Sequence, residues 1–95
     1  MIIRSQDREK IVNLNNITRI DIENGRDGMN VWASNMGITS LLGTYSTEEK
    51  AIKVLDMIQN AYTQYGTIKN GLGSIHGAFN LPKCFQMPSD AEVEV

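Results

Sequence analysis

Residues 46–65 show one long helical pattern. It follows residues 1–45, whose apolar residues are spaced as in β-strands. Ser46 and Glu49, three positions later, predict a capping box at the start of the helix. Gly66 is predicted to end it in a left-handed conformation. The apolar positions recur every three or four residues and form one stripe, which comprises Ala51, Val54, Leu55, Ile58, Ala61, Tyr62 and Tyr65. The chain is therefore predicted to be α+β, with the helix on one face of a sheet.

The strand patterns are short, and turn residues separate them. The pattern is clearest at residues 17–23, where Ile20 and Ile22 fall on one face and Arg19 and Asp21 on the other. Asn and Gly in the connections at 24–28 and 35–37 predict hairpins. Connections this short exclude parallel crossovers. We therefore expect an antiparallel meander of four or five strands, at residues 1–5, 11–14, 17–23, 29–34 and 38–45.

The last third of the chain is less regular. Residues 66–80 are rich in glycine and show no period, so they are either a plain connector or a flap over a ligand. Residues 81–87 are predicted to form a short strand at a sheet edge, because prolines bracket it. Residues 89–95 have the charge of a disordered tail, unless they rest on another surface such as a second subunit. All 95 residues are expected to form one domain.

The composition is that of a globular protein, with 41% hydrophobic and 21% charged residues. No apolar run approaches the roughly 20 residues that span a bilayer, and the N-terminus has no apolar core of a signal peptide. A single cysteine, Cys84, fits a reducing compartment, so we expect the protein in the cytosol. A net charge of −2 argues against binding to duplex nucleic acid but leaves a small anionic ligand open.

Catalysis finds little support in the residue types. His76 lies eight residues before Cys84, and the two would suit a general base and a nucleophile. The alternative, which we favour, is a loop histidine beside a cysteine buried in a strand. One His and one Cys fall short of the roughly three or four ligands of a zinc site. We expect no enzyme, metal site or cofactor, and we expect solvation for the turn and strand carboxylates Asp7, Glu9, Asp21, Glu23 and Asp27.

The binding candidates are aromatic residues and arginines. Trp32 falls on a strand face with Asn30 and Ser34, which is typical of an interface or a ligand platform as much as of partial burial. The arginines of the strand region, Arg4, Arg8, Arg19 and Arg26, would hold an anion if they converged, and otherwise are solvated singly. The predicted ligand-binding set comprises Arg4, Arg19, Trp32, His76 and Phe79.

Three stretches, MIIRSQDREKIVNLNNITRIDIE, LLGTYSTEEKAIKVLDMIQNAY and LPKCFQMPSDAEVEV, resemble a family of small proteins carried by phages, prophages and their hosts. The resemblance covers nearly the whole chain except residues 66–80. In size and in the order of strands followed by a helix, the chain also loosely resembles the phage anti-Thoeris proteins. Those proteins sequester cyclic ADP-ribose signals at a dimer interface without cleaving them, but none of their ligand residues matches a position here.

We therefore expect a non-enzymatic binding protein. The first hypothesis is a phage anti-defence sponge that sequesters a nucleotide second messenger. One helix leaves a face of the sheet open, and a second copy is the commonest cover for such a face, so we expect a homodimer or a larger homo-oligomer. The alternative is an inhibitor or adaptor that binds a host defence protein, as anti-CRISPR proteins do.

Overall fold

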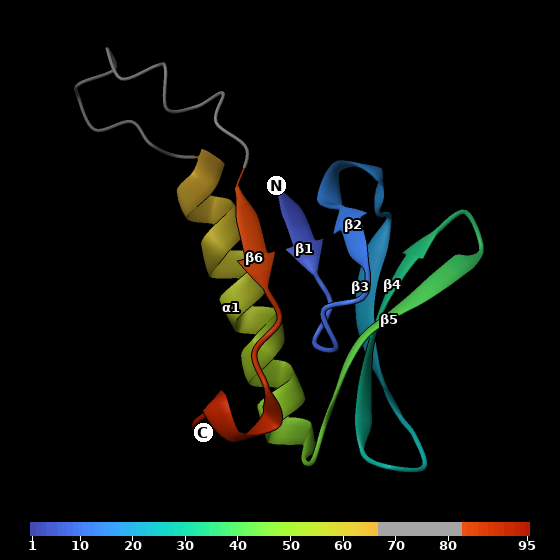
Figure 1. Cartoon of the computed structure of the whole chain (residues 1–95), viewed down its shortest axis with the longest axis vertical. Helices are drawn as coiled ribbons and strands as arrows, with labels where there is room; N and C mark the ends of the chain where they lie inside the picture. The colour runs from blue at the N-terminus through green and yellow to red at the C-terminus, as the bar shows by residue number, and fades with distance from the viewer. Residues whose placement is uncertain (67–82) are drawn as a thin grey trace.

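The computed structural model describes residues 1–66 and 83–95. The chain is α+β, as predicted (Figure 1). The glycine-rich segment lies outside the described residues, apart from Gly66 at the end of the helix. The elements in chain order are β1 (Ile2–Arg4), β2 (Ile11–Asn13), the 3-10 helix η1 (Leu14–Asn16), β3 (Arg19–Asn24), β4 (Met29–Asn35), β5 (Ile38–Tyr45), α1 (Glu48–Gly66), β6 (Cys84–Gln86) and the 3-10 helix η3 (Asp90–Glu92).

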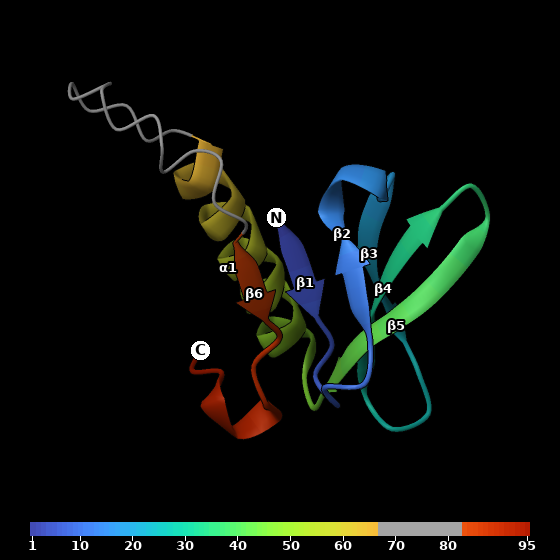
Figure 2. The same cartoon turned by 45° about the horizontal axis from the view of Figure 1, so that its top comes forward.

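The strands form two sheets of three, and the prediction of one sheet of four or five strands is wrong. β3, β4 and β5 make the predicted meander, which we call the meander sheet. β2, β1 and β6 lie side by side in a second sheet, the terminal sheet (Figure 2). The two separate because β2 ends early: the Asn13 side chain accepts the Asn15 N–H at 3.0 Å, and Leu14 N–H donates to the Met1 carbonyl at 3.0 Å. The chain turns through η1, and β3 then pairs with β4 and not with β2.

β6 lies at an edge of the terminal sheet, as predicted, but runs parallel to its neighbour β1. Its register sets Ile2 beside Cys84 and Arg4 beside Gln86. The antiparallel prediction, which rested on short connections, covered the strands of residues 1–45 and gave no direction for β6. β6 follows β1 only after β2–β5 and α1, which is enough chain for a crossover.

The β4–β5 hairpin closes through a turn of two residues, Met36 and Gly37, whose φ angles are 52° and 89°. Both angles lie in the left-handed region, as in the type I′ turns that match the twist of paired strands. Further along, the pairing shifts between Val31 and Trp32, so that Trp32 faces Leu41 while Val31 faces Gly43. This bulge turns Leu42 into the core, where it is buried.

The core lies between the inner faces of the two sheets and α1. It is formed by Met1, Ile3, Val31, Ala33, Leu42, Tyr45, Ala51, Val54, Ile58, Met87 and Val93. The predicted helix stripe is confirmed at Ala51, Val54 and Ile58, with Leu55 packed at its border. Tyr62, which the pattern also placed there, is 50% exposed, because it lies at the border of the stripe near the end of α1.

Thr47 caps α1, one residue later than the predicted capping box of Ser46 and Glu49. Thr47 Oγ1 accepts the Lys50 N–H at 3.1 Å, and the Thr47 carbonyl accepts the Ala51 N–H at 3.1 Å. The Ser46 N–H is engaged elsewhere, because it donates to Asp90 Oδ1 at 2.8 Å. Competition from the C-terminal segment thus displaces the predicted cap.

The acidic C-terminal segment packs on its own chain, so the expectation of a disordered tail is wrong, whereas its contact with a second subunit stays a prediction. Val93 is buried in the core. Lys50 Nζ donates to the Asp90 carbonyl at 2.9 Å and lies 3.4 Å from its carboxylate. Figure 1 shows this segment at the foot of α1. Contacts to Ser46 and Lys50 offset the charge that suggested disorder.

Candidate functional site

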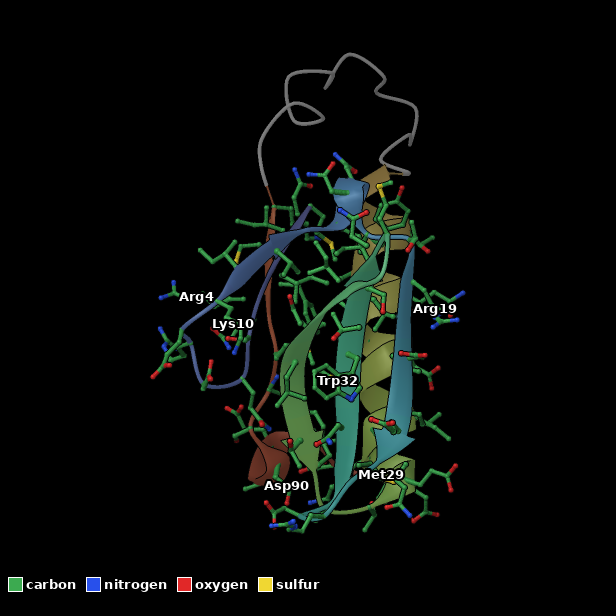
Figure 3. All side chains as sticks on the ribbon, turned by 90° about the vertical axis from the view of Figure 1, so that its right-hand side faces the viewer. Arg4, Lys10, Arg19, Met29, Trp32 and Asp90 are labelled. Atoms are coloured by element: carbon green, nitrogen blue, oxygen red, sulfur yellow. The ribbon has the colours of Figure 1, made fainter. Side chains whose placement is uncertain are left out.

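The outer face of the meander sheet carries the candidate site. α1 packs against the three strands of this sheet from within, and Figure 3 looks onto the opposite, outer face. Strand alternation and the two pairing registers fix which side chains share this face. They are Arg19, Asp21 and Glu23 from β3, Asn30, Trp32 and Ser34 from β4, and Thr39, Leu41 and Thr44 from β5.

This face is hollowed around Trp32. An open depression of about 460 Å³ is lined by Arg19, Asp21, Ile22, Glu23, Trp32, Ser34 and Thr39. A second depression of about 590 Å³ adjoins it along Arg19, Ser34 and Thr39, and extends to Met36 and Gly37 in the β4–β5 turn. We call the two together the Trp32 groove. It runs over the outer face from Glu23 to the tip of the hairpin.

Two polar contacts fix the side chains beside Trp32. The indole Nε1 donates to Glu23 Oε1 at 3.0 Å, and Arg19 Nε lies 3.3 Å from Asp21 Oδ2. Asp21 is directly opposite Trp32 in the β3–β4 ladder. The guanidinium is thus compensated by one carboxylate, whereas Glu23 contacts only the neutral indole among the described polar groups. The groove around Trp32 therefore carries a net negative charge.

The tip of the β4–β5 hairpin exposes a large apolar side chain at the end of the groove. Met36 lines the groove and is 88% exposed. Ile38 is 73% exposed, but its register opposite Asn35 turns it to the other face of the sheet. Scattered apolar residues are normal on a protein surface, but Met36 lies in the groove that contains the tryptophan. Sequence reasoning missed Met36, although a methionine in an Asn-Met-Gly turn is a signal, because the centre of such a turn points away from the core.

Of the five predicted ligand-binding residues, the structure brings Arg19 and Trp32 together. Arg4 lies in the terminal sheet, well apart from Trp32 (Figure 3). Its Nε and Nη2 donate to the Arg8 carbonyl at 3.1 and 3.0 Å. His76 and Phe79 lie outside the described residues. Glu23, the hydrogen-bond partner of the indole, was expected to be merely solvated, because its position beside Trp32 depends on a register that alternation alone does not give.

The described residues offer no second candidate site. Cys84 is exposed on β6 and not buried as expected, because its neighbour Phe85 takes the inward position. Its suggested partner His76 is outside the described ranges. Within residues 1–66 and 83–95, no three His, Cys, Asp or Glu side chains gather as metal ligands would.

The lowered carboxyl pKa values have structural causes. The pKa of Asp7 is lowered mainly by the Ser5 hydroxyl, which donates at 2.6 Å, and then by the Glu9 N–H at 2.9 Å. The Ser89 N–H, which donates at 2.8 Å, lowers the pKa of Glu92. Both carboxylates accept main-chain N–H groups of turns, so they stabilise local structure and do not mark a site.

Comparison with known proteins found no relative of this chain. No family model, no curated protein and no solved structure matches it. In the part of the chain that the structure describes, no helix combines the length and the apolar content that crossing a membrane requires.

Proposed function

We propose that this protein is a non-enzymatic binding protein that acts on a protein partner through the Trp32 groove and the hairpin tip. The observation that carries the proposal is the presence, along one groove, of half-buried Trp32 and the exposed side chain of Met36. Tryptophan and methionine are enriched at protein interfaces, where aromatic anchors account for much of the binding energy.

The charge of the groove indicates what the partner offers. Glu23 carries a carboxylate that no cation neutralises among the described contacts, and it holds the indole edge at 3.0 Å. A lysine or arginine over an indole face gains a cation–π attraction, and a nearby carboxylate adds to it. We therefore propose that a basic side chain of the partner lies at Trp32 and that apolar side chains cover Met36.

A sponge for a nucleotide second messenger is the second candidate, favoured by Arg19 and Trp32 in one depression. A guanidinium binds phosphate, and an indole stacks on a base. Two observations weigh against this candidate: Arg19 is engaged by Asp21 at 3.3 Å, and Glu23 would repel a phosphate. A phage anti-defence role, a cytosolic location and a homodimeric or larger assembly belong to the proposal in either form.

Selection from a displayed random-peptide library tests the first candidate. We expect peptides that combine Lys or Arg with aliphatic residues, with affinities measured by anisotropy of the labelled peptides. Trp32→Ala should weaken binding by about thirtyfold, which corresponds to roughly 2 kcal/mol for an interface anchor. Glu23→Gln should weaken the basic peptides selectively. Ile11→Ala, which removes an exposed apolar side chain of β2 in the terminal sheet, is the control and should leave binding unchanged.

A panel of cyclic nucleotides, cyclic ADP-ribose among them, tests the second candidate by thermal shift. A ligand that binds the folded state raises the melting temperature as its concentration exceeds Kd. A flat panel together with Trp32-dependent peptides supports the protein partner. If a nucleotide raises the melting temperature and Arg19→Ala abolishes this rise, the sponge is supported in place of the protein partner. If peptides bind equally well to Trp32→Ala, the groove is not the binding surface.

A further inference from the structure

β3 leaves one edge of the meander sheet open. The strand order is β3-β4-β5, and no strand in the described ranges pairs with β3 on its far side. The opposite edge is partly covered, because the Gln6 N–H donates to the Leu42 carbonyl at 2.7 Å and Gln6 Oε1 accepts the Thr44 N–H at 2.9 Å. Since an unpaired edge is a template for another strand, the sheet can be extended at β3.

The main-chain groups on the open edge belong to Ile20 and Ile22. Hydrogen-bonded pairs alternate along an antiparallel ladder. In the β3–β4 hairpin, the Gly25 N–H donates to the Gly28 carbonyl at 2.7 Å, which continues the ladder by one step. Odd-numbered residues of β3 therefore bond to β4, and the even-numbered ones direct N–H and C=O outward. Within residues 1–66 and 83–95, no further main-chain hydrogen bond reaches Ile20 or Ile22.

The charges of β3 are complementary to a second copy of the same strand in one antiparallel register. If Ile20 lies opposite Ile20 of the partner subunit, Arg19 of each copy faces the partner's Asp21. If Ile22 lies opposite Ile22 of the partner subunit, Asp21 faces the partner's Glu23. An intermediate register pairs Arg19 with the partner's Glu23 but sets Asp21 against the partner's Asp21. Opposite charges directly across a ladder stabilise it and like charges destabilise it, so the register centred on Ile20 is the matched one.

α1 adds an apolar flank on the same side of the molecule. Lys50 contacts Asp90, and Figure 3 shows Asp90 and β3 toward opposite sides. Successive helix residues are turned by about 100°, so Ile52 and Tyr62 lie on the flank turned away from Lys50. They are 45% and 50% exposed. A second copy at the β3 edge would bring its own flank toward this one and remove apolar surface from water.

From the open edge, the charge-matched register and the apolar flank, we infer that two copies pair antiparallel through β3, with Ile20 of both copies at the two-fold axis. The inference rests on the proposed self-association, and it identifies the β3 edge as the contact between the two copies. The two three-stranded meander sheets become one sheet of six strands. Both Trp32 grooves then lie on the same face, about 14 Å apart across three strand spacings.

A charge-exchange experiment tests this register by light scattering at micromolar concentration. Wild type should show twice the chain mass of 10.6 kDa. Arg19→Asp alone and Asp21→Arg alone set like charges opposite each other, so each should weaken the dimer at least tenfold. The double variant R19D/D21R should restore it, and so should an equal mixture of the two single variants. Arg26→Asp, the same charge change in the β3–β4 connection, is the control and should remain dimeric.

The outcomes separate this inference from the groove proposal. A mass of 10.6 kDa for wild type throughout the range would refute both self-association and the β3 edge. A dimer that survives both single substitutions would refute the edge while leaving self-association intact. Thermal melts verify that the single variants, which also lose the Arg19–Asp21 pair, remain folded. None of these masses depends on a bound peptide. Loss of peptide binding at the Trp32 groove would therefore be detected separately from loss of the dimer.

Discussion

Tyr45 connects the C-terminal segment to the core through one buried hydrogen bond. Its Oη donates to the Pro88 carbonyl at 2.7 Å, and the side chain is fully buried. Burial, and after it the charges of Asp90 and Glu92, raise the pKa of Tyr45 far above its ordinary value. The hydroxyl is therefore protonated, and able to donate, at every pH at which the protein would be studied.

Tyr45→Phe should lower the free energy of unfolding by about 1 kcal/mol, the usual contribution of one hydrogen bond. The loss stays modest because Gln6 Nε2 also contacts the Pro88 carbonyl, at 3.3 Å, and keeps it from being left without a donor. Urea denaturation at neutral pH measures the change. Tyr62→Phe removes the same hydroxyl from a half-exposed ring and should leave stability unaltered. Equal effects of the two substitutions would contradict the role given to the buried bond.

For single side chains, the sequence predicted which face a side chain lies on better than which residue it contacts. The outward position of Trp32 follows from strand alternation alone, and the structure confirms it. Its bond to Glu23 depends on how β3 aligns with β4, which the connection at 24–28 determines and no local pattern reveals. For Tyr62, periodicity gave the side of the helix but not the depth of burial, because a period reports orientation and not how far the sheets extend along α1.

At the scale of elements, the N-terminus of α1 gives a direct prediction. Thr47→Ala removes the side-chain oxygen that accepts the Lys50 N–H at 3.1 Å, and loss of such a cap costs about 1 kcal/mol. Ser46→Ala should cost less, because Ser46 contributes its main-chain N–H, which alanine retains. Chemical denaturation of the two variants measures both costs. A larger cost for Ser46→Ala would restore the capping box that the sequence alone suggested.

The contact between η3 and α1 should depend on pH. The Ser46 N–H, and to a lesser degree the Ser46 hydroxyl and then Lys50, lower the pKa of Asp90 from its ordinary value of 3.8. A carboxyl with a lowered pKa stabilises the fold above its unfolded value, and this contribution disappears as pH falls through the folded value. Asp90→Asn should therefore melt below wild type near pH 6, and the gap should close as pH falls below about 4. Asp56→Asn, on the exposed face of α1, serves as the control; a gap that persists in acid would rule out the charge of Asp90 as its cause.

Sequence patterns located the meander sheet well because its strands are neighbours along the chain. The predicted bounds of β5 coincide with those observed, and the turn at Met36 and Gly37 was expected from its composition. The terminal sheet was missed because β1 finds β6 at the far end of the chain. A pattern of period two reports which face of a strand is buried, but it carries no information on a partner that is distant in sequence.

For the whole molecule, removal of residues 89–95 should reduce stability without changing the mass. Val93 is only 3% exposed, and full burial of a valine side chain is worth about 2 kcal/mol. The contacts of this segment are within its own chain, and it lies apart from β3, so the dimer should persist. Denaturant midpoints and light scattering measure the two quantities. Removal of 94–95 alone, both exposed, should alter neither; a deletion of 89–95 that yields monomers would show that the tail also bridges two copies.

The parallel pairing of β1 with β6 sets the order in which parts of the chain can fold during synthesis by the ribosome. β1 is the central strand of its sheet and Ile3 is fully buried, yet Cys84 and Phe85 emerge only after α1 has been made. The strands of the meander sheet and α1 have all been synthesised before that point, so they can already pack against one another. Domains tend to form as the nascent chain emerges, and pairings distant in sequence close last. The strand translated first is thus the last to be enclosed, and until then its apolar side chains are a natural target for chaperones.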